Sequence, residues 1–471
     1  MESPVNPQVG DVLYLMATVE RAEGLTESQL SGLSVGSAAL VRGDMPAALA
    51  GFDIVLAAPD LTEQTRDQVA ALRLLTVTLL GDRAGRAADS GGFTGGPALR
   101  AVTLCLRADR HWRAGELAEA LWQNQLAENV AAEAGPVWHV YTRLMSAKRL
   151  VDMRVTARAA DLVARVRDEQ DRYGLHAFES IPAALEAALC LQRDEPEAAL
   201  RFATAAIGYA QRHRTTVAVP RALAVSALAH LRLGDIGSAT GQLGRMRELP
   251  DYFVLPDTVA RAALIDIAVA ARRSGPDAAA GLVRAGWPVI EAEPSSFLED
   301  PTTAGVLTGM SVRAGDLATA RLVVEATEAL AQRNPGISLL YDAARYARAV
   351  LHGDARALAG LLDSVSDPYL SRHLRTAIGA APTDSLPGGE RFPAEGPAHQ
   401  PPATGPGLAD AELTDREHEV AGLVGRGMTN RQVARAVGIT EHTVNFHLRK
   451  IYRKLDISSR AELIRRIARS G

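Results

Sequence analysis

The sequence predicts an all-α protein, and three observations support this class. Aromatic residues make up only 4% of the 471 residues, while Ala, Leu and Arg dominate, and this composition favours helices over strands. Apolar residues recur at spacings of three and four, as in Leu185, Ala188, Leu189 and Leu191. A similar turn also returns again and again along the first 380 residues. We therefore expect a body built from helical hairpins.

The recurring turn joins an apolar helix to an Ala-rich helix through a glycine followed closely by an acidic residue. Its first residues are Gly43, Gly81, Gly115, Gly234, Gly275, Gly315 and Gly353, with Asp194 taking the glycine position in one repeat and a weaker turn near Met153. Successive turns lie 34 to 41 residues apart. A near-constant period of this size indicates stacked helical hairpins, with an irregular helical bundle as the alternative.

Each part of this turn has a physical reason. Glycine ends a helix with a positive φ, which Asp tolerates better than most residues, and the acidic residue that follows can cap the next helix. An alanine five residues past the turn lets two helices pack closely, and it occurs at Ala48, Ala120, Ala199, Ala239, Ala280 and Ala320. This turn resembles that of tetratricopeptide repeats, although the usual period is about 34 and most large aromatic positions are missing here. The resemblance implies a tetratricopeptide-like α-solenoid over residues 1–379, with a sensing or interaction role.

Composition and charge change after this body. The stretch 380–409 holds seven prolines and five glycines, so we expect a flexible linker rather than a packed element. From residue 411 to the end there are 12 Lys and Arg against 7 Asp and Glu, which leaves 39 basic and 48 acidic residues before it. A mildly acidic body with a basic tail suits a module that binds a polyanion.

Four helices are predicted within residues 410–471. Their expected caps are Thr414, Thr429, Thr440 and Ser459. Glu417 has the spacing of a capping-box partner for Thr414, and Gly427 and Gly438 end the first two helices. The apolar residues expected to face inward are Val420, Leu423, Val424, Val433, Ala434, Val437, Val444, Leu448, Ile451 and Leu455.

The third of these helices, from about Glu441 to Leu455, is expected to present a basic face opposite its apolar stripe. That face carries His442, Phe446, Arg449 and Arg453, flanked by Asn445 and Lys450. Arg can pair with a guanine edge, Asn with an adenine edge, and Phe can touch a thymine methyl. The order helix, glycine turn, basic helix is typical of a helix-turn-helix motif, here about 430–449.

The pattern L-T-x-R-E-x-E-V, followed by G-x-T-N-R-Q-V-A, V-G-I-T-x-x-T-V-N-F-H-L and I-Y-x-K-L-x-I-x-x-R, resembles the LuxR-type DNA-binding domain over nearly all of Leu413–Ile467. The resemblance implies base reading by Asn445, Phe446 and Arg449. It also implies contacts to the DNA backbone from Thr429, Asn430, Arg431, Thr440, His442, Thr443, His447, Lys450, Arg453, Lys454 and Arg460. The family often has Lys at the position of Asn445, so this chain has one phosphate-attracting charge fewer.

Members of that family usually bind paired half-sites as dimers through the fourth helix. The resemblance therefore implies a homodimer on double-stranded promoter DNA, with Leu463 and Ile467 as dimerisation candidates. Either residue could equally belong to the core of its own module.

Other chemistries are not predicted. Lys148 is the only lysine before the C-terminal module and does not stand in a Gly-Lys-Ser/Thr sequence, so no P-loop is present. The run Gly32–Gly36 matches a hydrolase nucleophile elbow around Ser34, but helical sequence surrounds it where that motif needs a strand. Cys105 and Cys190 stand in apolar runs, which predicts buried, unpaired thiols. We expect no cofactor, no metal and no enzyme activity.

Two functions from different classes remain. The first is a sequence-specific transcription regulator whose repeat body senses a ligand or a protein partner, RNA polymerase among the candidates. The second is an interaction scaffold in which the DNA module is an accessory. No apolar run approaches the roughly 18–20 residues of a membrane span, and the first residues show no secretory signal pattern, so we expect a cytoplasmic protein without membrane partners.

Overall fold

In this computed structural model, the described residues are 26–79, 95–249, 256–365, 367–380 and 415–425, together with Met428, Val433, Val437, Val444, Leu448, Ile451, Lys454, Leu455 and Leu463. The chain divides into two compact units, a helical body up to Ala381 (residues 334–338 excepted) and a C-terminal unit from Pro382. The residues with an assigned structure form helices and turns, and no strand occurs within these ranges, which confirms the all-α class.

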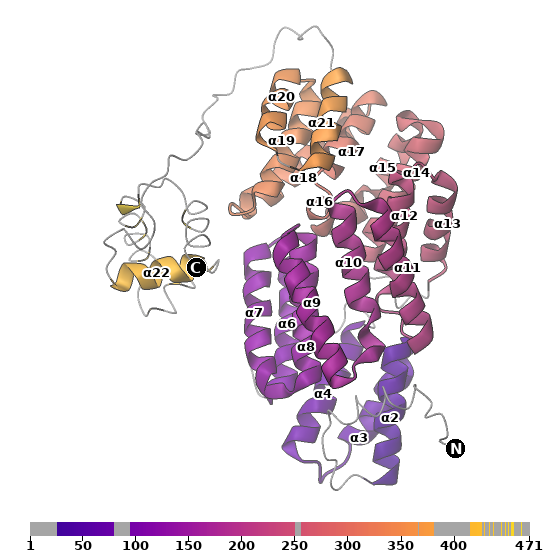
Figure 1. Ribbon diagram of the computed structural model, residues 1–471, viewed down its shortest axis with the longest axis vertical. Helices are drawn as coiled ribbons and strands as arrows, with labels where there is room; N and C mark the ends of the chain where they lie inside the picture. Colours follow the sequence, from indigo (N-terminus) through magenta and orange to yellow (C-terminus); the bar gives the residue numbers. More distant parts are fainter. Residues whose placement is uncertain are drawn as a thin grey trace. The chain divides into compact units, whose positions relative to one another are not determined.

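The body is a succession of antiparallel helical hairpins (Figure 1). The hairpins are α2 (Glu27–Arg42) with α3 (Met45–Leu56), α6 (Pro97–Arg113) with α7 (Leu117–Ala134), α8 (Pro136–Asp152) with α9 (Thr156–Tyr173), α10 (Ser180–Gln192) with α11 (Pro196–His213), α12 (Val219–Arg232) with α13 (Ile236–Arg247), α14 (Pro256–Ser274) with α15 (Pro276–Glu291), α17 (Thr303–Arg313) with α18 (Leu317–Arg333), and α19 (Ser338–His352) with α20 (Ala355–Ser364). The remaining elements are α4 (Glu63–Leu79), the short 3₁₀ helix η2 (His176–Phe178), α16 (Ser295–Leu298) and α21 (Pro368–Ala380).

The turns lie where the glycine pattern predicts them. The glycines at Gly43, Gly115, Gly234, Gly275, Gly315 and Gly353 have φ values between 64° and 87°. Asp194 takes the glycine position with φ 63°, and the weaker turn near Met153 places Arg154 at φ 58°. The turn expected at Gly81 lies outside the described residues. The stacked hairpins of the predicted tetratricopeptide-like repeat are therefore present.

The acidic residue after the turn caps the next helix when it is aspartate. The carboxylates of Asp44, Asp235, Asp316 and Asp354 each accept the backbone N–H three residues on, at 2.9 to 3.2 Å. Glu116 and Glu195 make no such bond, because their additional methylene group does not suit the tight cap geometry. The predicted close-packing alanines, Ala48, Ala120, Ala199, Ala239, Ala280 and Ala320, are all at most 3% exposed.

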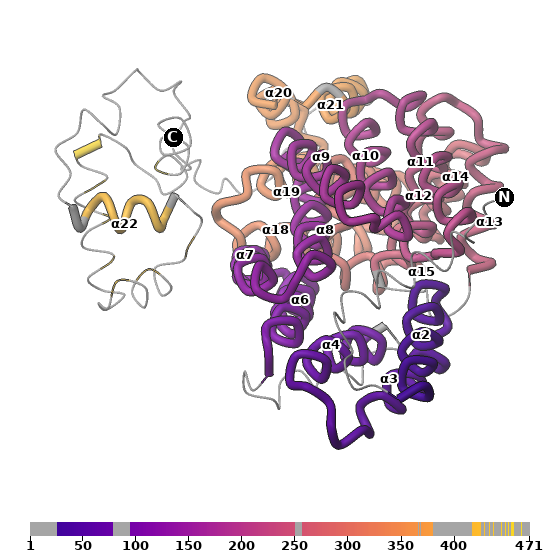
Figure 2. Tube along the Cα trace, turned by 60° about the horizontal axis from the view of Figure 1, so that its bottom comes forward, coloured from indigo at the N-terminus to yellow at the C-terminus, as the bar shows by residue number. Residues whose placement is uncertain are grey.

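Successive repeats are tied together by arginines at helix ends. Arg232, in the last turn of α12, donates to the carbonyl of Leu191 at the end of α10. Arg272, in the last turn of α14, donates to the carbonyl of Leu231 at 3.3 Å. Both contacts span 41 residues, one repeat, and both place a cation at the negative end of the preceding helix, where it is stabilising. Helices α10, α12 and α14 consequently lie side by side (Figure 2).

The early and late repeats of the body also contact each other directly. The indole N–H of Trp112 in α6 donates to Ser295 Oγ of α16 at 2.9 Å, and Arg333 of α18 donates to the carbonyl of Ala114 at 3.1 Å. Arg154, in the turn after α8, is paired with Asp367 at the start of α21. The body therefore closes on itself instead of ending as an open stack.

Two motifs from the sequence have structural roles. Ser34 lies inside α2, and the described residues directly before it, from Glu27 on, are helical, so the strand that a nucleophile elbow needs at that place is replaced by helix. The glycines beside it serve packing, because a Cβ on Gly51 of α3 would lie 2.5 Å from the Gly32 carbonyl oxygen and 2.7 Å from Gly36 Cα. Cys105 and Cys190 are buried and unpaired, as predicted. No helix among the described residues is long and apolar enough to cross a membrane.

Candidate DNA-binding site

The C-terminal unit begins with α22 (Asp415–Gly425), which starts close to the predicted cap Thr414. Thr414 itself lies outside the described residues. Val420, Ala421 and Val424 of α22 are fully buried and form one apolar stripe, since residues three and four apart share a helix face. The first predicted helix of the module and its inward face are therefore confirmed.

The described positions of the following helices meet α22 in a single core. Its buried members are Val420, Ala421, Val424, Val433, Val437, Val444, Leu448, Ile451, Leu455 and Leu463, with Leu423 and Met428 packed at its edge. The four core residues between 444 and 455 follow the spacing i, i+4, i+7, i+11 that the sequence predicts for the inner face of the third helix. Leu463 is fully buried here, which fits the core role rather than the dimer contact that the sequence left open.

A half-buried ion pair stabilises this core. Lys454 Nζ lies 2.7 Å from Glu417 Oε2, and this bond joins two residues 37 positions apart. Glu417 is only 3% exposed, whereas the Lys454 side chain is 37% exposed. The resemblance assigned Lys454 to the DNA backbone and did not reveal this partner. A signal was available, because Glu417 shares the helix face of Val420, Ala421 and Val424, and a carboxylate on an apolar face needs a cation.

Most of the predicted contact residues lie outside the described residues, and the structure gives no geometry for them. They are Asn445, Phe446, Arg449, Thr429, Asn430, Arg431, Thr440, His442, Thr443, His447, Lys450, Arg453, Arg460 and the dimer candidate Ile467. What the structure does establish is the buried face of the helix that carries the base-reading candidates. The linker predicted over 380–409 also lies outside, except for Ala380 at the end of α21.

In the body, a network of buried ions joins α8, α12 and α14. Asp152 is fully buried between Lys148 Nζ at 3.0 Å and Arg221 Nη2 at 2.5 Å. Arg221 also lies 3.3 Å from Glu299. Arg261 pairs with both Glu299 and Asp257, and its guanidinium group lies 2.9 Å from the Asp257 carboxylate. Burial by itself would raise the pKa of Asp152, but the positive charges of Arg221, Lys148 and Arg261 outweigh it and hold the pKa well below the usual carboxyl range. These charges are structural, since each has its partner inside the body.

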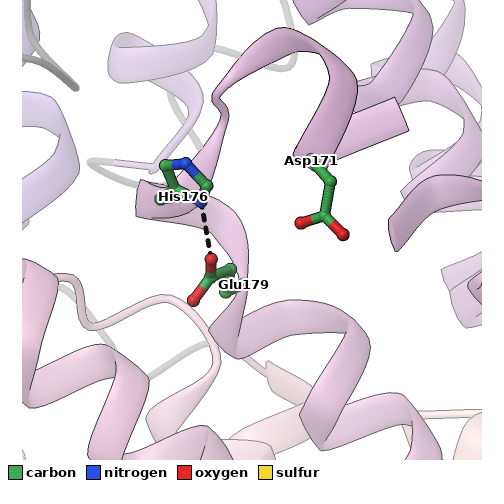
Figure 3. A group of neighbouring side chains, drawn as sticks. All are labelled: Asp171, His176 and Glu179. Carbon is green, nitrogen blue, oxygen red and sulfur yellow. Dashed lines mark hydrogen bonds and ion pairs between the residues drawn. The ribbon is translucent and has the colours of Figure 1, made fainter. Parts of the chain in front are cut away.

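One trio in the body has the composition of a metal site. Asp171, His176 and Glu179 offer ligand atoms that lie within 4.8 Å of one another (Figure 3). His176 Nδ1 is already 2.7 Å from Glu179 Oε1, and Asp171 and His176 are exposed. The dashed line in Figure 3 marks this contact, which an ordinary surface ion pair explains without a metal.

Comparisons with known proteins agree with the geometry of the C-terminal unit. The fold and core define a helix-turn-helix module carried by a repeat body. Residues 411–467 match the family model described as bacterial regulatory proteins, luxR family. The C-terminal segment is therefore a LuxR-type helix-turn-helix domain.

The similar curated proteins match over a short part of this chain. The tetrathionate response regulatory protein TtrR of Salmonella typhimurium is 42% identical over 59 residues, 12% of this chain and 29% of that protein. The uncharacterized response regulatory protein YgeK of Escherichia coli is 38% identical over 63 residues, 13% of this chain and 43% of that protein. The HTH-type transcriptional regulator MalT of Vibrio campbellii is 40% identical over 52 residues, 11% of this chain and 6% of that protein. Less than half the length of each relative is thus covered.

A solved structure aligns with a larger part of the chain. It is that of a Rap protein complexed with competence and sporulation factor, and it covers 76% of this chain and 99% of its own, at a TM-score of 0.49 and 15% identity. This likeness is too distant to inform the function of the body.

Proposed function

We propose that the protein is a transcription regulator that binds double-stranded promoter DNA through its C-terminal domain. The observation that carries this proposal is the match of residues 411–467 to the luxR family of bacterial regulatory proteins. The regulatory names of TtrR and MalT support it. Under this proposal Asn445, Phe446 and Arg449 read bases in the major groove.

The buried face of the third helix supports this assignment. Val444, Leu448, Ile451 and Leu455 all contribute to the core. At 100° per residue, the direction opposite to them corresponds to positions 442, 446, 449 and 453, with 445 beside them. The helical period therefore predicts an outward position for the proposed reading residues, which is the position that a recognition helix requires.

The phosphate contacts are proposed for Thr429, Asn430, Arg431, Thr440, His442, Thr443, His447, Lys450, Arg453 and Arg460. A contact from Lys454 would have to share its ammonium group with Glu417. We further propose that the protein binds DNA as a homodimer through the fourth helix. Ile467 is the better candidate there, because the burial of Leu463 in its own module leaves that side chain little surface to offer.

We propose that the body controls this domain by sensing a ligand or a protein partner, with RNA polymerase as one candidate partner. A closed body of stacked repeats, in which an ion pair and a hydrogen bond link distant repeats, is a rigid platform for such a contact. We also propose that the protein is not an enzyme, as expected from the sequence, since the matched relatives TtrR and MalT are named as regulators.

Selection of DNA from a random pool tests the reading face. The wild-type full chain should enrich one motif, while Arg449→Ala should lose about 1–3 kcal/mol of discrimination at one base pair of each half-site. Arg469→Ala removes the same charge outside the proposed contact set and serves as the control. An unchanged motif for Arg449→Ala would remove Arg449 from the reading face. Failure of the wild type to select any sequence would favour the scaffold function instead.

A further inference from the structure

The body contains a cavity of about 240 Å³ between its repeats. Its wall comes from α10, α12, α14, α16 and α17, and residues of α21 complete it. Protein interiors are close-packed and leave few voids larger than a water molecule. A space of this size, bounded by six helices, is therefore large enough for a small molecule.

Most of the wall is apolar. Leu228 of α12, Leu264 of α14, and Leu307 and Met310 of α17 line it. A cavity of about 150 Å³ holds a benzene molecule, so this one has room for on the order of ten non-hydrogen atoms. These side chains suit the short apolar part of a ligand, because ligand pockets combine an apolar wall with a few polar groups that fix orientation.

The polar groups at one end of the cavity carry an excess of positive charge. Arg232 lies 3.3 Å from Asp194, but Asp194 is also 2.5 Å from Arg372 and so serves two guanidinium groups. Arg272, the second arginine at this end, donates to the Leu231 carbonyl and has no carboxylate partner within the described ranges.

The carboxylates elsewhere in the lining are already engaged. Glu299 accepts from Arg221 and Arg261, and Asp257 accepts from Arg261. Glu293 accepts from the backbone N–H of Ser295, and Asp300 accepts from the backbone N–H and hydroxyl of Thr302. Among the five arginines that line the cavity, Arg272 is therefore the one without a carboxylate partner in the described ranges, whereas Arg154, Arg221, Arg232 and Arg261 each have one.

We propose that this cavity binds a small amphipathic anion, a carboxylate with an apolar part of fewer than about ten non-hydrogen atoms. Its anionic group would lie between Arg232 and Arg272, and its apolar part would pack on Leu228, Leu264 and Leu307. Guanidinium groups are the preferred partners of carboxylates, because their planar N–H groups match the two carboxylate oxygens.

Such a ligand would touch the last helix of the body. Tyr369 and His373 of α21 line the cavity, and the Tyr369 ring lies 3.9 Å from the Arg232 guanidinium carbon. The bond of Asp367 to Arg154 and that of Arg372 to Asp194 hold α21 against the turns of earlier repeats. Helix α21 directly precedes the segment that leads to the LuxR-type domain. Ligand binding would therefore strengthen the docking of α21 and thereby alter DNA binding, a step that rests on the proposed function.

The test uses two anionic probes and a neutral match with the full chain. Phenylacetate and octanoate should bind in a saturable way in calorimetry, whereas phenylacetamide, which has nearly the same shape as phenylacetate, should bind at least tenfold more weakly. Arg272→Gln should weaken phenylacetate binding at least tenfold, while the neighbouring Arg273→Gln should leave it unchanged, because Arg273 contacts Thr240 and does not line the cavity. Ala268→Phe, which adds a ring to the cavity wall, should abolish binding.

Three results would overturn the proposal: no binding of either anion, equal binding of phenylacetamide, or unaltered binding by Arg272→Gln. Hydrogen exchange of residues 368–380 reports the α21 step, and phenylacetate should slow it several-fold; unchanged exchange in the presence of bound probe would refute the coupling. Failure of the DNA-binding proposal would look different. The full chain would then bind phenylacetate in an Arg272-dependent way yet select no DNA sequence.

Discussion

Replacing Lys454 with methionine separates two roles that this residue could have in the C-terminal domain. Methionine keeps the apolar length of the side chain and removes the ammonium group that lies 2.7 Å from Glu417. If the ion pair is the main role, the substitution should destabilise the domain. If a phosphate contact is the main role, it should mainly weaken DNA binding and its dependence on salt.

The size of the stability effect follows from burial. Removing one partner of a fully buried pair costs about 3–5 kcal/mol, because the remaining buried charge loses its counter-charge. Glu417 is 3% exposed and meets that condition, but the Lys454 side chain is 37% exposed, and water screens such a pair. We therefore expect a loss of about 2 kcal/mol. Glu417→Gln should cost less, since the Lys454 side chain is 37% exposed and can keep its ammonium group in water.

Hydrogen exchange of the peptide 415–425 in the full chain measures this effect. A loss of about 2 kcal/mol corresponds to roughly thirtyfold faster exchange through local opening of α22. Lys450→Met is the matched control on the same predicted helix, and it should leave exchange unchanged while reducing the salt slope of DNA binding by about 0.9. The ion-pair account fails if Lys454→Met leaves exchange of α22 unchanged and lowers the salt slope as Lys450→Met does.

Three further predictions concern the body. Gly51→Ala should destabilise the α2–α3 hairpin by about 1–3 kcal/mol, because its Cβ would lie 2.5 Å from the Gly32 carbonyl oxygen. Gly208→Ala should be neutral or stabilising, because a Cβ there meets nothing within 4 Å. Urea unfolding of the two variants compares them. Asp152→Asn should lower the free energy of unfolding by about 3–5 kcal/mol at neutral pH. Because the pKa of Asp152 is lowered in the folded state, this difference from wild type should persist down to about pH 4 and shrink only below it. Thermal melts of both proteins at several pH values would measure it. Burial raises the pKa of the Cys105 thiol to about 12, so iodoacetamide at pH 8 should label Cys105 only after denaturation, and rapid labelling of the folded chain would contradict its burial.

Local features were the part of the fold that the sequence predicts well. A glycine with positive φ at Gly43 or Gly315 follows from the steric freedom of glycine, and Asp194 takes the same conformation for a related reason. The stripe from Val444 to Leu455 follows from the period of the helix and is buried as expected. These features depend on neighbours within a few residues, so their signals are visible in a single sequence.

Contacts between distant repeats were not predictable in the same way. Trp112 and Ser295 are 183 residues apart, and Arg154 and Asp367 are 213 apart, with no pattern in the sequence linking the members of either pair. Their meeting depends on the accumulated rotation of many hairpins, which small changes in each turn would alter. The pairing of Glu417 with Lys454 is intermediate, since the apolar neighbours of Glu417 signal a buried charge but do not say which cation meets it.

Arg232 and Arg272 repeat at equivalent helix ends, and this repetition could have been predicted from the sequence. The two arginines stand 40 residues apart, one repeat, and each donates to a carbonyl of the preceding repeat. A search for charged residues in phase with the glycine turns would have found them. Their second role, as the cationic end of a cavity, depends on the placement of α21 and needs the structure.

Footprinting of the full chain on promoter fragments of its own genome would show whether the protein is a sequence-specific regulator. The protected sites should share one motif in paired half-sites, and protection should weaken steeply as salt rises. Arg449→Ala should keep salt-sensitive binding but no longer prefer the motif. Uniform, motif-free protection by the wild-type chain, or none at all, would contradict the assignment of this protein as a sequence-specific regulator.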